Sequence, residues 1–211
     1  MTPYDSYRGH SKEIIKSKAY HFDYKNDETC EKWLDGKDLN RYFTIWNNKW
    51  ISYGDWLAAP RERKYFEDRR ILFREEPGKG KRIQASIVDS GFFYGHSISL
   101  FKPHPEQIQN LKYTLGIVNS KLMSWIGGLT LPNFSKDIFP KLNSNDIKEL
   151  FIPKEFIYFI EIDSKVTQIL DLKKANPNAD TSALEAEIDQ LVYALYKLTE
   201  EEIKIVEESV R

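Results

Sequence analysis

The stretch from Leu111 to Pro153 constrains the fold most, because its apolar pattern is helical at first and then gives way to turn residues. Apolar residues recur at the spacing of one helix face, at Leu115, Val118, Leu122, Trp125 and Ile126. A patch rich in glycine and proline follows at 127–132, and a short DIKEL segment then ends before Pro153. The stretch holds no nucleophile, metal-ligand cluster or phosphate-binding loop. It therefore predicts a scaffold helix over residues 108–126.

Composition places the chain among ordinary folded proteins. Its 211 residues, 41% hydrophobic and 14% aromatic, are enough for a substantial core. No apolar run is long enough to span a bilayer, and no signal-peptide pattern opens the sequence. The single cysteine, Cys30, excludes an internal disulfide framework and fits a reducing compartment. The histidines lack the spacing of metal ligands. We expect a cytoplasmic bacterial protein without a membrane partner or a bound metal.

Short strands dominate the expectation for residues 1–153. Segments 42–46 and 49–53 flank Asn47-Asn48, a pair that tolerates the positive φ of a tight hairpin. Further strands are expected over 70–74, 82–88 and 92–101, separated by the turn sequences PGKGK and DSG. The predicted fold class is α+β: a mixed or antiparallel β-rich domain over 1–153 with the embedded helix 108–126, followed by a helical hairpin.

The segment 154–211 predicts that helical pair. One amphipathic helix is expected from about Glu155 to Lys174, and NPNAD forms the loop after it. Ser182 with Glu185 forms a capping box for the next helix, and Thr199 with Glu202 forms another. A coiled-coil-like apolar seam runs along the helix that Ser182 opens, at Leu184, Ile188, Leu191, Leu195 and Leu198. The helices are expected to fold back as an antiparallel pair.

Charge is distributed unevenly along the chain. The formal net charge of −1 argues against a nucleic-acid partner. From Gly36 to Arg82, however, twelve basic and seven acidic residues give +5, whereas nine acidic and three basic residues from Asp180 to the end give −6. Basic surface is therefore expected in the N-terminal half, where it favours an anionic partner.

Several motifs occur in a recognisable order. These are Val118-Asn119-Ser120-Lys121-Leu122, Phe139-Pro140-Lys141 and Ile147-Lys148-Glu149-Leu150-Phe151-Ile152-Pro153. In this order they resemble the C-terminal target-recognition domain of TaqI-like and type IIG DNA methyltransferases and restriction–modification enzymes. Phe151 departs from that pattern, which usually has proline there. The run 188–203 resembles a common ending of these proteins, with Lys197 in place of glycine, and segments such as 56–61 match more loosely.

The resemblance implies that the β-rich region is a recognition domain for double-stranded DNA. The catalytic motifs of the family are missing: Asn176-Pro177-Asn178 lacks the N-P-P-Y/F pattern, and neither a glycine-rich loop for S-adenosylmethionine nor a PD…ExK array is present. We therefore expect no enzyme activity and no cofactor in this chain. S-adenosylmethionine, and Mg²⁺ if a nuclease is present, would belong to a methyltransferase/nuclease domain in the same or a partner polypeptide.

The expected DNA contacts are basic side chains in loops. Arg61, Arg63 and Lys64 follow Pro60 and carry donors that bridge phosphates or read guanine edges. Further candidates lie on nearby strands or turns, at Arg69, Arg70, Lys79, Lys81 and Arg82, and His96 in GFFYGHS is a candidate groove or phosphate contact. Each has an ordinary alternative: a surface charge paired with an acid, or for His96 a half-exposed strand residue.

Three functions stay open on the sequence alone. The first is the recognition domain of a type IIG-like adenine-N6 methyltransferase/endonuclease, as a fragment without its catalytic domains. The second is a free-standing half-specificity subunit of a type I-like system, forming a homodimer through its C-terminal helices. The third is a protein–protein adaptor or a self-contained enzyme unrelated to DNA.

Overall fold

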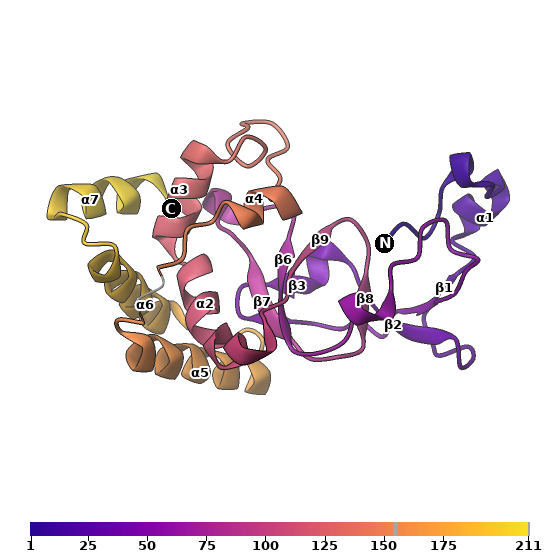
Figure 1. Ribbon diagram of the computed structural model, residues 1–211, viewed down its shortest axis with the longest axis horizontal. Coiled ribbons are helices and arrows are strands. Elements are labelled where there is room, and N and C mark those ends of the chain that lie inside the picture. Colours follow the sequence, from indigo (N-terminus) through magenta and orange to yellow (C-terminus); the bar gives the residue numbers. More distant parts are fainter. Residues whose placement is uncertain (154–155, 211) are drawn as a thin grey trace.

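A three-stranded antiparallel sheet in the order β7-β6-β9 runs through the middle of the molecule (Figure 1). The computed structural model describes residues 1–153 and 156–210. The sheet consists of β6 (Arg70–Arg74), β7 (Ala85–Val88) and β9 (Ile98–Phe101). Along β6, Ile71 and Phe73 face one hydrophobic core, whereas Leu72 between them faces another. The sheet therefore separates two cores by the two-residue alternation of a strand.

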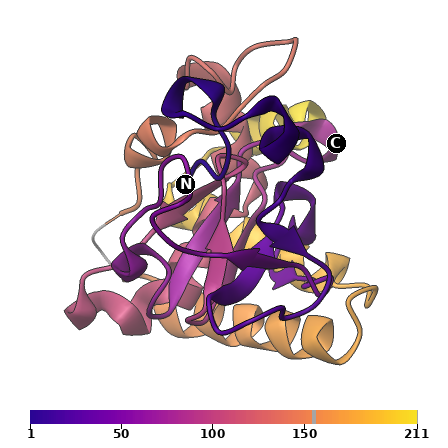
Figure 2. The ribbon, with the colours of Figure 1, turned by 90° about the vertical axis from the view of Figure 1, so that its right-hand side faces the viewer.

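The first core belongs to the N-terminal lobe, at the right in Figure 1 and nearest the viewer in Figure 2. Its sheet has the order β1-β5-β2-β8, in which only the β2–β8 pair is parallel. The strands are β1 (His21–Phe22), β2 (Cys30–Leu34), β5 (Trp50–Ser52) and β8 (Phe92–Tyr94), and β3 (Leu39–Asn40) pairs separately with β4 (Phe43–Thr44). Short helices complete the lobe: 3-10 turns at Ser6–Arg8, Gly36–Asp38 and Arg63–Tyr65, and α1 (Lys12–Ser17).

The second core lies in the helical lobe, on the other face of the central sheet. Its helices are α2 (Leu111–Val118), α3 (Lys121–Thr130), α4 (Ser144–Lys148), α5 (Phe159–Ala175), α6 (Ser182–Leu195) and α7 (Glu200–Ser209), and a 3-10 segment at Pro105–Asn110 precedes α2. Seam residues Ile188 and Leu195 are buried in this core with residues of β6 and α2. The expected seam therefore packs inside its own domain. The α+β class predicted from the sequence is confirmed.

The Val118–Leu122 motif connects α2 and α3 to β7 through side-chain hydrogen bonds. Asn119 Oδ1 accepts a hydrogen bond from the Ala85 amide at 3.0 Å, and its Nδ2 donates to the Ala85 carbonyl at 3.0 Å. The extended Ser120 caps α3 by accepting from the Met123 amide at 3.2 Å. Ser124 Oγ then accepts from the Ile83 amide at 3.1 Å. The side chains of Asn119 and Ser120 in this motif, with Ser124 just after it, therefore satisfy backbone groups that burial would otherwise leave unpaired.

The same motif corrects one prediction. The single helix expected over 108–126 is interrupted at Asn119 and Ser120, where α2 ends and α3 begins. The apolar period continues across the break, so periodicity alone did not reveal it. Serine at the start of α3 supplies the physical signal, because its hydroxyl accepts from a first-turn amide.

Strand pairing also differs from expectation. The hairpin predicted across Asn47-Asn48 does not form, because β4 pairs with β3 and β5 pairs with β1 and β2. Asn48 does adopt a positive φ of 53°, but the Asn47 side chain donates to Asp38 and the Asn48 side chain to the Asp23 carbonyl. The turn chemistry was correct, and long-range partners determined the pairing. The strand predicted over 92–101 is likewise two strands, β8 and β9, in different sheets.

Helix starts follow the sequence with small shifts. The predicted box of Thr199 and Glu202 forms at α7 and is confirmed. At α6, Thr181 rather than Ser182 holds the N-cap position, and its hydroxyl donates to Glu185 at 2.7 Å. Of the helix expected from Glu155, the structure describes α5 from Phe159, and Glu155 itself lies outside the described residues. No described helix has the combination of length and apolarity that crossing a bilayer requires.

Candidate nucleic-acid interface

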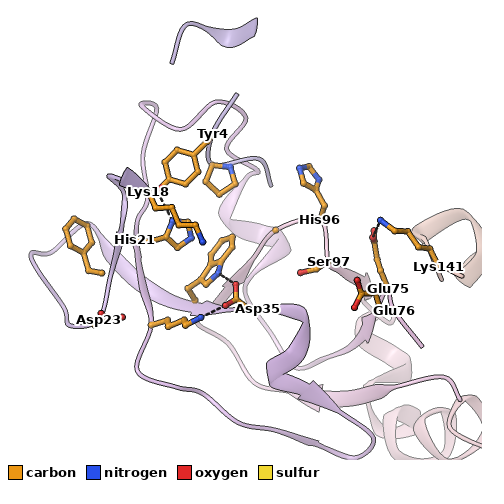
Figure 3. Close-up of a pocket in the computed structure, with 15 residues that line it drawn as sticks. Tyr4, Lys18, His21, Asp23, Asp35, Glu75, Glu76, His96, Ser97 and Lys141 are labelled. Carbon is orange, nitrogen blue, oxygen red and sulfur yellow. Dashed lines mark hydrogen bonds and ion pairs between the residues drawn. The ribbon is translucent and has the colours of Figure 1, made fainter. Parts of the chain in front are cut away.

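A cleft of about 670 Å³ opens between the N-terminal arm, residues 1–20, and the end of the central sheet (Figure 3). Tyr4 and Lys18 line it from the arm, His96 and Ser97 from the β8–β9 connection, and Lys141 from the loop before α4. Its walls thus come from segments far apart in the sequence. The cleft is large enough to receive part of a ligand. Its lining carries both signs of charge, with the lysines Lys18, Lys49 and Lys141 and the acids Asp23, Asp35, Glu75 and Glu76. Lys49 pairs with Asp35, whereas Lys18 has no acidic partner among the described residues.

Positive charge converges on His96 at the rim. Burial lowers the pKa of His96, and the Met1 ammonium group, Arg61 and Lys141 lower it further by repulsion. The Met1 group donates to the Tyr94 carbonyl at 3.2 Å, and burial, with Arg61 nearby, lowers its pKa to about 5. His96 Nε2 lies 3.1 Å from the Thr2 hydroxyl. Because the Met1 amine is uncharged near pH 7, Arg61 and Lys141 are the charges that act on the ring there, and an approaching phosphate would favour protonation of His96.

Arg61 is the best-placed arginine among the candidates. It is exposed in the loop after Pro60, and no acidic side chain of the described residues pairs with it. The loop is fixed from behind, because the Tyr53 hydroxyl donates to the Arg61 carbonyl at 2.6 Å. A guanidinium on a fixed loop, free of internal partners, matches the requirement for a phosphate or guanine contact.

Arg63 and Lys64 lie beside it but have protein partners. Arg63 donates to Glu31 at 2.6 Å and stacks over the rings of Tyr53 and Phe93 at 5.0 and 5.6 Å. Lys64 pairs with Glu62 at 2.8 Å and remains exposed. Such surface pairs are weak, so both side chains remain available to a stronger anion, Arg63 at greater cost because of its stacking.

Arg70 and Arg82 have structural roles instead. Arg70 is fully buried, at 0% exposure, and its guanidinium donates to the carbonyls of Asp68, Asp89 and Phe92. Arg82 is half-buried and donates to the Asn119 carbonyl at 2.8 Å. Burial lowers the pKa of both. Neither guanidinium is free to meet DNA in this fold, although the sequence places both in basic runs.

The remaining candidates are dispersed. Arg69 lies 3.7 Å from Asp89 and lines another hollow with residues of α5, away from His96. Lys81 donates to the Ser135 carbonyl at 3.3 Å and lies 3.4 Å from Asp137, which places the PGKGK turn against the loop that carries Lys141. Lys79, in that turn, is exposed. The structure therefore groups Arg61 with His96, and Lys79 with Lys81, rather than forming one continuous patch of all nine.

Sequence reasoning missed Lys18 and Lys141 as rim residues. Lys18 ends α1 with a positive φ of 51° and is exposed, and Lys141 approaches Glu75 only to 3.8 Å. Lys141 belongs to the Phe139-Pro140-Lys141 motif, which was its only sequence signal. Lys141 lies near His96 and Lys18 near His21, and both placements depend on tertiary packing, which no local pattern encodes.

Comparison with known proteins places this architecture in a class. The model of the TaqI-like C-terminal specificity domain matches residues 31–152, more than half of the chain. The chain therefore belongs to the TaqI-like C-terminal specificity domain family. The resemblance seen in its motifs is thus confirmed.

Two similar proteins are far longer than this chain. A predicted type II restriction enzyme and methyltransferase of Methanocaldococcus jannaschii is 29% identical over 194 residues, which cover 87% of this chain and 16% of that protein. The solved structure of the type IIL restriction–modification enzyme MmeI in complex with DNA has a TM-score of 0.61 at 10% identity, covering 94% of this chain and 32% of MmeI. The latter likeness concerns the fold alone. The chain thus spans a sixth to a third of these proteins.

Proposed function

We propose that this chain recognises a specific sequence of double-stranded DNA as the specificity part of a restriction–modification enzyme. The observation that carries the proposal is that His96, Lys18 and Lys141 line one cleft, with Arg61 close enough to lower the pKa of His96, in a domain of the TaqI-like specificity family. Phosphate contacts from such groups fix a protein on the duplex, while a few side chains read base edges. The basic N-terminal half supplies the former despite the net charge of −1.

Catalysis is assigned to another part of the enzyme. We propose that an adenine-N6 methyltransferase, with or without a nuclease, resides in the same or a partner polypeptide and receives the base selected by this domain. S-adenosylmethionine and any Mg²⁺ would be held there. Among the described residues, no cluster of His, Cys, Asp and Glu side chains has the arrangement of a metal site. The relatives, several times longer than this chain, agree with such a division of labour.

The homodimer alternative has little support in the packing. The predicted apolar seam is occupied, because Ile188 and Leu195 lie in the core of their own lobe and Leu184, Leu191 and Leu198 pack against it. Among the described residues, we find no surface that favours a protein partner over an anionic duplex, so no specific observation supports the adaptor alternative. DNA recognition is therefore the function that the residues favour.

Selection from a randomised duplex pool tests the proposal. The chain is incubated with the pool at low and moderate salt, and the retained DNA is sequenced. We expect an enriched motif with an affinity that falls steeply with salt, because bound cations release counterions from DNA. Arg61→Ala should weaken binding about tenfold and reduce the salt slope by about one.

Arg69→Ala is the matched control, since Arg69 is an exposed arginine outside the cleft. It should leave affinity and slope almost unchanged. Salt-dependent binding without a motif would show that the catalytic part completes the specificity. Failure to retain any duplex at low salt would refute DNA recognition by this chain and favour the adaptor.

A further inference from the structure

The loop that carries Lys141 has an apolar tip that packing does not explain. Ile138 is 75% exposed and Phe139 is 84% exposed, on a segment that projects beyond the helices (Figure 1). Within residues 1–153 and 156–210, no aromatic ring stacks on Phe139. Phe139 also has a positive φ of 54°, an uncommon conformation for a bulky side chain and one that the following Pro140 disfavours further. Strain of this kind is concentrated at functional positions.

The base of this loop is firmly held. Phe134 and Leu142 are fully buried on either side of the tip. The Leu142 amide donates to the Glu75 carbonyl at 2.7 Å, and the Lys141 amide donates to the Asn133 carbonyl at 3.1 Å. The fold therefore presents Ile138 and Phe139 on an anchored support, so a ligand need not order the loop before it binds.

Cationic side chains surround the tip. Lys136 and Lys141 flank it and are exposed, and Lys81 reaches it from the PGKGK turn through Ser135 and Asp137. With exposed Lys79 there are four lysines, of which Lys81 lies 3.4 Å from Asp137 and Lys141 lies 3.8 Å from Glu75. Phe151, another exposed phenylalanine, differs: its ring lies against the ring of Tyr196. An apolar tip inside a collar of lysines suits an anionic polymer with an apolar interior, and stacked duplex DNA is such a polymer.

We propose that Ile138 and Phe139 form a wedge that inserts between adjacent base pairs of the bound duplex, while the surrounding lysines hold the phosphates. The wedge unstacks one base step and widens the site next to the cleft, to which Lys141 of the same loop belongs. This inference rests on the proposed DNA-recognition function and adds a deformation of the DNA to it. The free-energy cost of unstacking one base step is offset by the additional contacts that the deformed duplex makes with the protein.

The test uses the full chain and the duplex enriched in the selection. 2-Aminopurine replaces each adenine of that duplex in turn, because its fluorescence rises when a neighbouring base unstacks. We expect binding of the unaltered chain to raise the signal at one step, and Phe139→Ala to abolish the rise and weaken affinity about tenfold. Phe139→Trp should preserve both. Phe151→Ala, which also removes an exposed phenyl ring, should change neither.

The outcomes separate the wedge from the function on which it rests. A chain that binds the duplex with normal salt dependence but shows no fluorescence rise at any position overturns the wedge and leaves recognition intact. The same holds if Phe139→Ala binds and unstacks like the unaltered chain. A chain that binds no duplex overturns both proposals. Phe139→Ala lies at an exposed tip, and its thermal melting should match that of the unaltered chain.

Discussion

The hydrogen-bonded region around Asn119 and the cleft around His96 use polar side chains in opposite ways. At Asn119, buried amide and hydroxyl groups pair with backbone groups of the same chain. At His96, cationic groups gather at a solvent-exposed rim, and Arg61 has no acidic partner among the described residues. The clearest family motif thus builds the first region, whereas most of the second carries no motif. The family was therefore recognisable from residues that hold the fold together, and not from residues that would contact a ligand.

The largest expected effect tests whether Arg70 belongs with the scaffold. Arg70→Met should lower the free energy of unfolding by about 4 kcal/mol, because the carbonyls of Asp68, Asp89 and Phe92 all lose the buried guanidinium that donates to them. Urea denaturation measures this. Arg69→Met, one residue away and exposed, should stay within about 0.5 kcal/mol of the unaltered chain. A stable Arg70→Met variant with weakened DNA binding would instead show that Arg70 takes part in DNA binding.

The second effect concerns pH and His21, which lines the cleft. Burial lowers the pKa of His21 to about 4, an effect that Asp35 opposes and that Lys18 and Lys49 reinforce. Between pH 6.5 and 4 the unfolded chain therefore binds a proton that the folded chain does not. The free energy of unfolding should fall as pH drops through this range, by at most about 3 kcal/mol.

The Met1 amine, with its pKa lowered to about 5, acts in the same direction between about pH 8 and 5. His21→Asn keeps a polar partner for the Tyr4 hydroxyl, which lies 2.8 Å from His21 Nδ1. Urea denaturation at stepwise pH should show a flatter profile below pH 6.5 for this variant. An unchanged profile would show that other groups destabilise the lobe in acid.

Asn119 tests the scaffold directly with a smaller effect. Asn119→Ala should lower the free energy of unfolding by about 2 kcal/mol, because the amide and carbonyl of buried Ala85 both lose a partner. Asn119→Asp retains an acceptor for the amide but repels the carbonyl, so it should not restore stability. DNA affinity at a temperature where the variant is folded should be unchanged. A specific loss of affinity would mean that the two regions are coupled.

The smallest effect sharpens the role of His96. A phosphate near the ring would raise its pKa again, so DNA affinity should rise about two- to threefold from pH 7.5 to 6. His96→Gln should remove that dependence while preserving a partner for the Thr2 hydroxyl. Titration of labelled duplex at fixed ionic strength measures both. The same pH dependence in His96→Gln would exclude the ring from the interface.

Local chemistry made much of the fold predictable. The strand over 70–74 and the Thr199–Glu202 box form as predicted, because their signals lie within a few residues. The hairpin across Asn47-Asn48 was wrong because the partners of β5 lie in β1 and β2. Whether two strands pair depends on the packing of the whole sheet, which a turn sequence does not determine.

The candidate site was less predictable for the same reason. Arg61 and Arg70 both occur in basic runs, yet one is exposed and the other is fully buried. Charge counts cannot tell them apart, because Arg61 lies in a loop whereas Arg70 lies on a buried position of β6. Lys18 comes from the N-terminal arm and Lys141 from the loop before α4, and only the folded chain brings them to one cleft.

The alternation along β6 sets a rule for building chimeras. A hybrid that joins the N-terminal lobe of one relative to the helical lobe of another must keep each residue of this strand on its original face of the sheet. The strand has only 5 residues. An offset of one position would turn Arg70 and Leu72 toward the helices and Ile71 and Phe73 toward the other core. Joining the two sequences within the turns at 77–82 or 95–97 leaves β6 intact and avoids this one-residue offset. Under the proposed function, any exchange of DNA specificity by swapping lobes must first satisfy the register of this short strand.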